Sequence, residues 1–598
     1  MYLRANRRSK DGKTHRYFSV VESRRLGSGR VVQRTVLYLG EINDSQEAGW
    51  QKSLEVFDEA RQSSITLSLF PEDREIPAEA VDGLQVKLQE MELRRPRVFG
   101  SCWLGCELWR ELELEGFWQE KLGAETKREW VPWEKVLRLL VVNRLIDPGS
   151  EFRVHRQWFD RSAMGELLET DFVVAEKDRL YRCLDRLLAH KAQLFVHLRK
   201  RWQDLFRAQF EVLLYDLTST YIEGQGEEIP KARYGYSRDQ RFDCLQVVIA
   251  LVITPEGFPL AYEVMDGNTS DRTTLRGFLE KIEATYGRAR RVWVMDRGIP
   301  TEEVLAEMRD PQREVFYLVG TRRSKIQQYE KKWLELPWQR VREAVEVKLF
   351  TEQGELYVLA KSEGRRAKER AMRRRRLARL LRKLRAMRHS CPARDRLLMR
   401  IGAAKKDAGQ AFRFVRIHLP PVGEEVTRQT FTFTLDKEKL RQAELRDGHY
   451  LLRSNLVGED PAVLWERYVQ LTQIEAAFKA LKSELGIRPI YHQLEQRVEA
   501  HILVAFLAYC LTVTLKQRLT ALAPGLTPQA VLEQLATIQM LDVCFPTTDG
   551  RWLVMPRYTQ PEPEQQLLLH RLKLALPAQP PPRLKAKSTE FPAEALRL

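Results

Sequence analysis

The first residues that could perform chemistry are a tyrosine, a glutamate and a lysine spaced seven residues apart: Tyr468, Glu475 and Lys482. A step of seven residues in an α-helix returns to almost the same direction, so we expect the three side chains along one line of a helix. Apolar residues spaced by three and four predict the face that this helix buries beside that line: Leu471, Ile474, Phe478, Leu481 and Leu485. Glu475 should lie where the helix meets the structure it packs on. The alternative is an exposed helix face whose spacing is accidental.

Two aspartates each follow an apolar run, Asp216 after residues 212–215 and Asp296 after residues 292–295. A carboxylate in such a place is costly to desolvate unless a cation meets it. If the fold brings both to Glu475, three carboxylates repel one another, and oxygen ligands favour Mg²⁺ or Mn²⁺ over zinc. We therefore predict a catalytic site with two such ions about 4 Å apart, which activate a water or a 3′ hydroxyl for attack on a phosphate. For any single acid the alternative is a salt bridge or a strand-end cap.

The elements that must position these acids begin near residue 209. Between 209 and 325 the pattern predicts three strands, a helix, a strand, a helix and a strand, the order of the ribonuclease H-like fold. Strands one and four of that sheet are neighbours, so the two aspartates would converge, and the final helix would bring in Glu475. That helix belongs to a second part of the core, 448–530, so residues 326–447 are predicted to be an insertion.

The predicted fold class is α/β (α+β multidomain): a ribonuclease H-like mixed sheet flanked by helices and interrupted by a β-rich insertion. The insertion also contains an arginine-rich helical segment near residues 364–389. The remaining segments are predicted as a basic β-hairpin module, a polar connector, a helical DNA-binding domain, and a C-terminal region with a proline-rich, flexible tail: 1–60, 61–97, 98–208 and 531–598.

The composition favours a nucleic-acid partner. Lysine and arginine exceed aspartate and glutamate by 99 to 82, a net charge of +17 with a pI near 9.5. The longest apolar run, 502–515, is shorter than the roughly 20 residues of a membrane span and predicts a buried helix. Seven cysteines without paired ligand spacing argue against disulfides and zinc. The N-terminus has no apolar signal region, so we expect a cytoplasmic protein without a membrane partner.

Together these residues resemble the DDE-type transposases of bacterial insertion sequences, in the branch with a tyrosine, arginine, glutamate and lysine signature on the last catalytic helix. The resemblance covers about 209–325 and 447–515. Tyr468, Glu475 and Lys482 match the signature, and Leu471 stands where its arginine is expected. Further matches are "YGYSRDQRFDCLQ" (234–246), "DGNTSD" (266–271), "MDRG" around Asp296 and "IRPIYH" (487–492).

The resemblance implies a transposase that binds terminal inverted repeats in double-stranded DNA, cleaves at them and transfers the strands to target DNA. It also implies a homodimer on DNA, a nucleoid location when bound, and no small-molecule cofactor. Asp216, Asp296 and Glu475 are the expected catalytic and metal-binding residues. Contacts with DNA are expected from seven residues: Tyr468, Lys482, Arg488, His492, Arg238, Arg241 and Arg297.

Several alternatives stay open. Arg238 and Arg241 could pair with Asp239 and Asp243 instead of DNA, and His492 could cap a turn. For the whole protein, one alternative is a ribonuclease H-like nuclease without strand transfer. Another is a non-catalytic, domesticated DNA-binding regulator, although a binding module gains nothing from three clustered acids.

Overall fold

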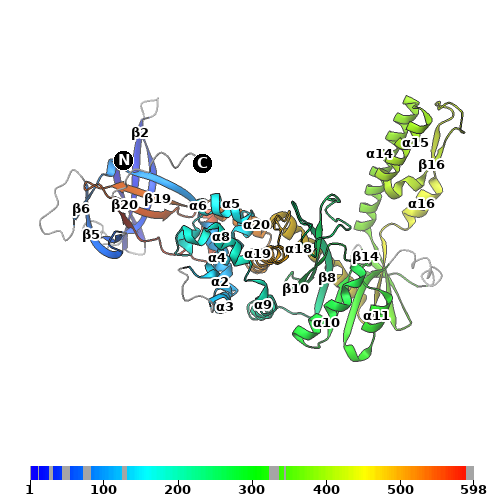
Figure 1. Ribbon diagram of the computed structural model, residues 1–598, viewed down its shortest axis with the longest axis horizontal. Helices are drawn as coiled ribbons and strands as arrows, with labels where there is room; N and C mark the ends of the chain where they lie inside the picture. Colours follow the sequence, from blue (N-terminus) through cyan, green and yellow to red (C-terminus); the bar gives the residue numbers. More distant parts are fainter. Residues whose placement is uncertain are drawn as a thin grey trace.

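The structure is a computed structural model that describes residues 2–10, 13–25, 31–42, 54–58, 60–71, 83–123, 131–321, 336–342 and 345–586. The molecule is elongated. Sheets built from both ends of the chain lie at one end, a helical region follows, and a large sheet with a projecting helical arm lies at the other end (Figure 1).

A mixed sheet of nine strands carries the two aspartates. Five of its strands follow the order β10-β9-β8-β11-β12, with β8, β11 and β12 parallel and β9 and β10 antiparallel. This is the strand order and direction of a ribonuclease H-like sheet, as expected. Its elements are β8 (Val212–Tyr221), β9 (Gln246–Ile253), β10 (Pro259–Asp266), α10 (Leu275–Tyr286), β11 (Arg291–Met295), α11 (Glu302–Met308) and β12 (Val315–Thr321).

Three strands of the predicted insertion, β13, β14 and β15, do not belong to a separate unit, because they extend this same sheet. Beyond β12 the order continues β18-β15-β14-β13, starting with antiparallel pairing of β18 on β12. The buried side chain of Glu355 on β15 accepts from Arg453 on β18 at 2.6 Å and from Arg309 at 2.8 Å. The added strands are β13 (Gln339–Arg342), β14 (Val345–Glu352), β15 (Glu355–Ser362) and β18 (His449–Ser454). Pairing with β18 satisfies an edge that β12 would otherwise expose.

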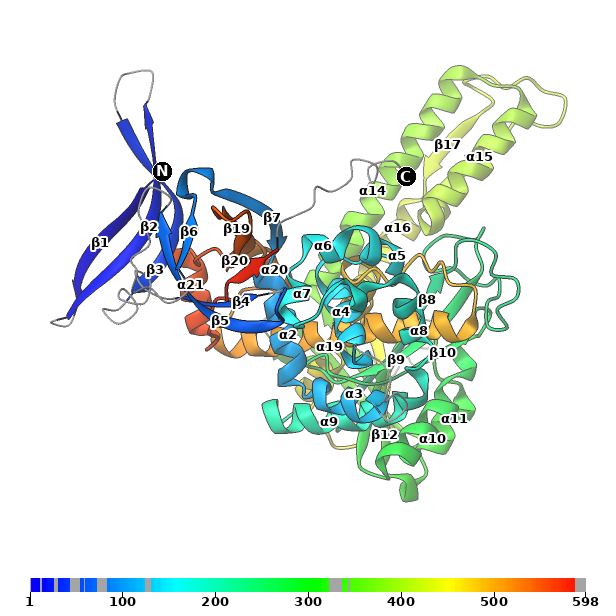
Figure 2. The ribbon, with the colours of Figure 1, turned by 60° about the vertical axis from the view of Figure 1, so that its left-hand side comes forward.

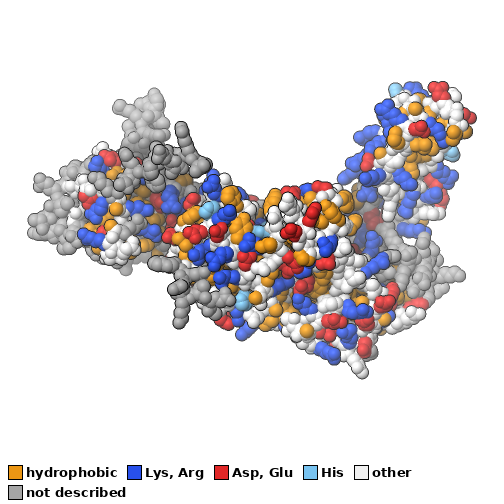
Figure 3. Space-filling view, in the orientation of Figure 1, with side chains coloured by type: hydrophobic (Ala, Val, Ile, Leu, Met, Phe, Trp, Pro, Cys, Tyr) orange, Lys and Arg blue, Asp and Glu red, His pale blue; other side chains and the backbone are white. Residues whose placement is uncertain are grey.

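Only the segment between β15 and β18 projects from the sheet as an arm (Figures 1 and 2). It consists of α14 (Glu363–Ser390), α15 (Arg394–Ala408), β16 (Val415–His418), β17 (Thr432–Leu435) and α16 (Lys437–Leu445). The arm has its own apolar core, to which α14 contributes residues spaced by three and four: Leu377, Leu380, Leu384 and Met387. Arginines and lysines cover much of its outer surface (Figure 3).

One long helix joins the helical region to the large sheet. Helix α19 (Glu495–Leu522) packs on α2 (Gly100–Glu111), α4 (Trp133–Ile146) and α8 (Lys177–Leu184). Helices α3 (Leu114–Gly123) and α9 (Lys191–Phe206) complete the region. Among the described helices, α19 alone is long and apolar enough to cross a membrane, but 89% of its apolar window is buried inside the protein. It is therefore the core helix expected from the sequence.

The ends of the chain pair with each other, which the sequence analysis did not anticipate. The predicted hairpin is β2 (Lys13–Arg25) with β3 (Val31–Ile42), and β1 (Tyr2–Lys10) adds a third strand. A second sheet joins the two ends of the chain, because its C-terminal strands β21 and β19 pair with the N-terminal strands β4 and β7. Its order is β6-β5-β4-β21-β20-β19-β7. Its N-terminal strands are β4 (Leu54–Asp58), β5 (Ser63–Pro71), β6 (Gly83–Val86) and β7 (Glu92–Val98).

Two predictions for these segments are wrong. The described residues of the connector 61–97 contain three strands, and the proline-rich end contains α21 (Pro563–Arg571) and β21 (Arg583–Lys585). Its first prolines lead into α21, where Pro563 occupies the first turn. Residues 587–598 of the predicted tail lie outside the described residues. The other C-terminal elements are α20 (Pro528–Ala536), β19 (Gln539–Pro546) and β20 (Trp552–Tyr558).

Candidate active site

Asp216 and Asp296 lie side by side because of the strand register. Strand β8 pairs with β11 in parallel and places Tyr215 opposite Met295. The next residue after each of these is an aspartate, so Asp216 and Asp296 are neighbours. Asp216 continues within β8 and is half-buried, whereas Asp296 follows the last residue of β11 and is exposed. The backbone N–H of Arg297 donates to Asp296 Oδ1 at 2.7 Å. The two carboxylates therefore lie next to each other, one within β8 and one just after the end of β11.

The surroundings of Asp216 disfavour its charged form. Burial raises the pKa of its carboxyl to about 6, and the charges of Asp296 and Asp271 also raise it, against the Leu217 N–H and Arg238 that lower it. A carboxylate beside a second carboxylate is stabilised by a cation between them. The oxygen-only donors and the raised pKa thus fit a hard divalent cation.

Glu475 lies on the predicted final helix of the core, but this segment is not one regular α-helix. Tyr468 lies in α17 (Pro461–Val469), Glu475 in α18 (Leu471–Lys479) and Lys482 in a π-helical turn, η8 (Ala480–Glu484). Helix α17 packs on β11 and β12, and α18 packs on β8. The predicted apolar face is confirmed, since four of its residues are buried and Leu471 is half-buried: Ile474, Phe478, Leu481 and Leu485.

Tyr468 connects the helices to the aspartates. Burial raises the pKa of its hydroxyl to about 12, and the nearby charges of Asp296 and Glu475 contribute. Its hydroxyl and Asp296 both face Gly320 on β12. The oxygens of Asp216, Asp296 and Glu475 do not all lie within 4.8 Å of one another. The three carboxylates therefore do not form a closed metal cage in this structure.

The predicted single line of side chains is wrong for Lys482. Its Nζ donates to Asp239 at 2.8 Å, and Arg488 also pairs with Asp239. A π-helical turn holds more residues than an α-helical turn, so it rotates Lys482 away from the line through Tyr468 and Glu475. The side chain of Asp239 is buried, and from the sequence it was considered only as a partner of Arg238 or Arg241.

Two further expected DNA-binding arginines, Arg238 and Arg241, pair with carboxylates. Arg238 pairs with Asp271 at 2.6 Å rather than with Asp239, and its backbone N–H donates to Ser219. Arg241 binds Asp243 at 2.9 Å, the pairing considered above, and Glu223 at 3.0 Å. Each of these guanidinium groups faces a carboxylate that a DNA phosphate could replace.

Arg297 and His492 have contrasting positions. Arg297 follows Asp296 directly and is exposed. His492 is buried, and its ring faces Glu151 at 3.5 Å and His501 rather than the three acids. The alternative that His492 caps a turn has no support from these contacts.

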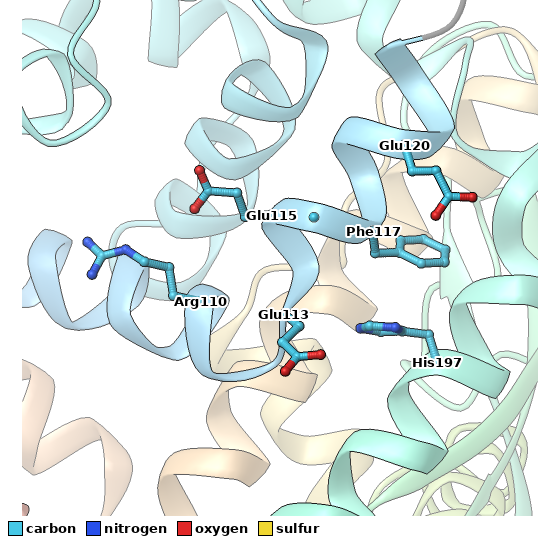
Figure 4. Close-up of a pocket in the computed structure, with 7 residues that line it drawn as sticks. Arg110, Glu113, Glu115, Phe117, Glu120 and His197 are labelled. Atoms are coloured by element: carbon cyan, nitrogen blue, oxygen red, sulfur yellow. The ribbon is translucent and has the colours of Figure 1, made fainter.

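A hollow of about 450 Å³ on the helical region is a different feature (Figure 4). Glu113, Phe117, Glu120 and His197 border it, and His197 Nε2 bonds the Leu112 carbonyl at 2.8 Å. Its glutamates make it a poor site for a phosphate.

A ribonuclease H-like sheet with two aspartates at one edge and a glutamate on the following helix defines a class of enzymes that cut and join nucleic-acid strands. The family model described as "Transposase DDE domain" matches residues 207–511, just over half of the 598 residues, and the chain therefore belongs to this family. Residues 3–61 match the N-terminal domain of IS1634 family transposases. The protein is a DNA transposase of an insertion-sequence type, and enzymes of the DDE family use divalent metal ions.

The other comparisons add little. A piggyBac transposase in a synaptic complex with hairpin DNA matches over 75% of this chain and 82% of that chain, with 10% identity and a TM-score of 0.34. That score is too low to support an inference. No curated protein matches the chain significantly. The assignment to the branch with the tyrosine, arginine, glutamate and lysine signature stays a prediction.

Gly320 on β12 lies against the Tyr468 hydroxyl and Asp296, so replacing it tests whether this close packing positions the site. A Cβ on Gly320 would lie 2.7 Å from the Tyr468 hydroxyl and 3.4 Å from Asp296 Oδ1. We expect Gly320→Ala to displace one of these groups by up to about 1 Å and to lower the cleavage rate about 10²-fold. The matched control is Gly298→Ala, because a Cβ there meets nothing within 4 Å. Cleavage of an end-labelled DNA fragment measures both, and equal rates would show that the contact with Tyr468 does not position the site.

Proposed function

We propose that this transposase binds the inverted repeats at the ends of its own insertion sequence, hydrolyses the phosphodiester bond at each end, and joins the freed 3′ hydroxyls to target DNA. The observation that carries this proposal is the register of β8 and β11, which aligns Asp216 with Asp296 beneath the helix of Glu475. A transposase that only bound DNA would have no use for acids aligned in this way.

The catalytic residues we propose are Asp216, Asp296 and Glu475, and they would hold two Mg²⁺ or Mn²⁺ ions. The support is chemical: all donors are carboxylate oxygens, and the pKa of Asp216 is raised by burial and by the charge of Asp296. Such ions, when bound, supply positive charge that polarises the phosphate and stabilises the leaving oxygen. The Tyr468 hydroxyl, close to both Asp296 and Glu475, would orient the scissile phosphate by donating a hydrogen bond.

The basic side chains around the acids would bind the DNA backbone. Lys482 and Arg488 are held by Asp239, and Arg238 is held by Asp271. These pairs keep the cations in place before DNA arrives, and phosphates would then share them. Arg241 and the exposed Arg297 would add further phosphate contacts.

The remaining parts of the chain would recognise and hold the DNA ends. We assign reading of the repeats to residues 1–60 and 98–208, and salt-sensitive phosphate binding to the arginine-rich arm. Because two ends must be cut together, the active form would be a homodimer on double-stranded DNA. We place it in the bacterial cytoplasm, associated with the nucleoid.

The test is an assay with the gene's flanking ends on a labelled fragment, supplied with Mg²⁺ or Mn²⁺ and a supercoiled target. We expect metal-dependent cutting at a defined end, followed by joining of that end to the target. Cutting without joining would favour the nuclease alternative. Binding without cutting would favour the regulator alternative.

A further inference from the structure

A buried cluster of ligand-type side chains lies apart from the three acids. Glu151, His492 and His501 are all buried, and one potential ligand atom from each lies within 4.8 Å of the others. Glu151 Oε1 is 3.5 Å from His492 Nε2, and the two imidazole rings are 5.4 Å apart between centroids. Three atoms at most 4.8 Å apart leave a central point no more than about 2.8 Å from each, so shifts below about 1 Å would reach zinc ligand distances.

His501 provides an independent indication of a ligand. Its Nε2 is buried and has no hydrogen-bond partner. The other ring nitrogen, Nδ1, faces Arg144 Nη2 at 3.4 Å, so Nε2 is the ring nitrogen left for a ligand. Because a buried polar atom without a partner costs free energy, an ion bound at Nε2 would satisfy this nitrogen.

The cluster borders a cavity of about 490 Å³, which Arg144, Tyr181, Arg488 and Arg497 also line. Of these cations, Arg497 pairs with Asp185 and Arg488 pairs with Asp239. Arg144 donates to the Gly486 carbonyl at 3.0 Å, but its Nη2 lies 3.4 Å from His501 Nδ1 and opposes a second positive charge. The carboxylate of Glu151 offsets this charge, and the cavity gives a fourth ligand, water or an anion, room to bind.

We propose that Glu151, His492 and His501 form a zinc site that fastens the helical region to the catalytic part of the chain. Two imidazoles and one carboxylate, with a fourth position open to a cavity, suit Zn²⁺ rather than Mg²⁺. Glu151 begins α5 (Glu151–Arg153) in the helical region, His492 follows the catalytic helices, and His501 lies in α19. The ion would thus join Glu151 to a segment, 492–501, that begins more than 300 positions later in the chain. This site is independent of the catalytic acids and of the proposed DNA chemistry.

The test uses untagged, full-length protein, stripped with a chelator and then exposed to Zn²⁺ alone. We expect one tightly held zinc per chain after gel filtration, measured by elemental mass spectrometry. Zinc should remain in Asp296→Asn, which removes a catalytic acid, and in the control His197→Ala, a half-buried histidine outside the cluster. It should be lost from His501→Ala. Retention of zinc in His501→Ala, or no zinc in the wild type, would overturn the proposal.

A second measurement covers the case in which His501→Ala fails to fold. Co²⁺ bound in place of zinc to the wild-type protein should give the visible absorption of a four-coordinate site with nitrogen and oxygen ligands. Hydrogen exchange should slow around residues 148–153 and 487–501 when Zn²⁺ is added. If Co²⁺ gives only the weak spectrum of an octahedral ion and exchange is unchanged, the cluster is a hydrogen-bonded network and not a metal site.

Discussion

Replacing Glu475 by glutamine is expected to abolish cleavage while DNA binding is retained. Glutamine keeps the size of the side chain but removes the charge that would hold a cation beside Asp216 and Asp296. Loss of a group that merely supports a ligand costs 10–100-fold, so loss of the ligand itself should cost roughly 10³-fold or more. Because Glu475 is exposed on α18, the substitution should leave the fold intact.

The experiment compares single-turnover cleavage rates at the transposon end with affinities from gel-shift titration of the same DNA. Glu484→Gln is the matched control, since Glu484 is another exposed acid nine residues further along and lies outside the site. We expect wild-type rates from the control. If Glu475→Gln cleaved as fast as the wild type, the three-acid site would be wrong; if it bound no DNA, its effect on catalysis would have to be measured at saturating DNA.

Replacing Arg97 by methionine is expected to loosen the sheet formed by the two ends of the chain. The Arg97 side chain is fully buried and donates to Asp542 at 2.7 Å and 3.1 Å, with Glu166 at 3.0 Å. Removing one partner of a buried ion pair leaves an uncompensated charge and costs about 3–5 kcal/mol. At 1.36 kcal/mol per tenfold change, amide exchange in β7 and β19 should accelerate by at least roughly 10²-fold.

Hydrogen exchange is the right measurement because a chain of this size does not unfold in two states. Arg94→Met on the same strand is the control: its side chain is half exposed and stacks on Trp552 at 4.6 Å, which is worth about 1 kcal/mol or less. The double variant Arg97→Met with Asp542→Leu should recover most of the loss, since an apolar pair can replace a buried ion pair. Equal exchange in Arg97→Met and Arg94→Met would show that the pair does not stabilise the sheet.

The sequence predicted the catalytic sheet well because its signals are local. In β8 and in β11 an apolar run is followed directly by an aspartate, and strand order follows from the sequence of elements. The apolar face of the catalytic helices could also be read directly. The break at Gln470 and the π-helical turn at 480–484 could not, because nothing in a periodic pattern marks where a helix changes its hydrogen bonding.

The terminal sheet was missed for a different reason. Strand β7 exposes five of its seven residues and pairs with β19, more than 440 positions away in the chain. A strand with polar residues on both faces has no alternating pattern, and its partner cannot be found from local sequence. The roles of Asp239, Gly320 and Glu151 depend in the same way on contacts between distant segments, although Asp239 lies beside arginines that were considered.

The way in which the arm is attached has a mechanical consequence. Helix α14 starts where β15 ends, and the chain returns from the arm into β18, so both attachments are strands of the sheet that carries Asp216 and Asp296. A helix of 28 residues is about 42 Å long, and a tilt of about 5° at its base moves its tip by about 4 Å. The base of the arm is therefore fixed in the catalytic sheet, and a displacement of its tip is transmitted to that sheet. DNA pulling on the tip would apply a torque to β15 and β18, which are joined through β12 to the strands that carry the two aspartates.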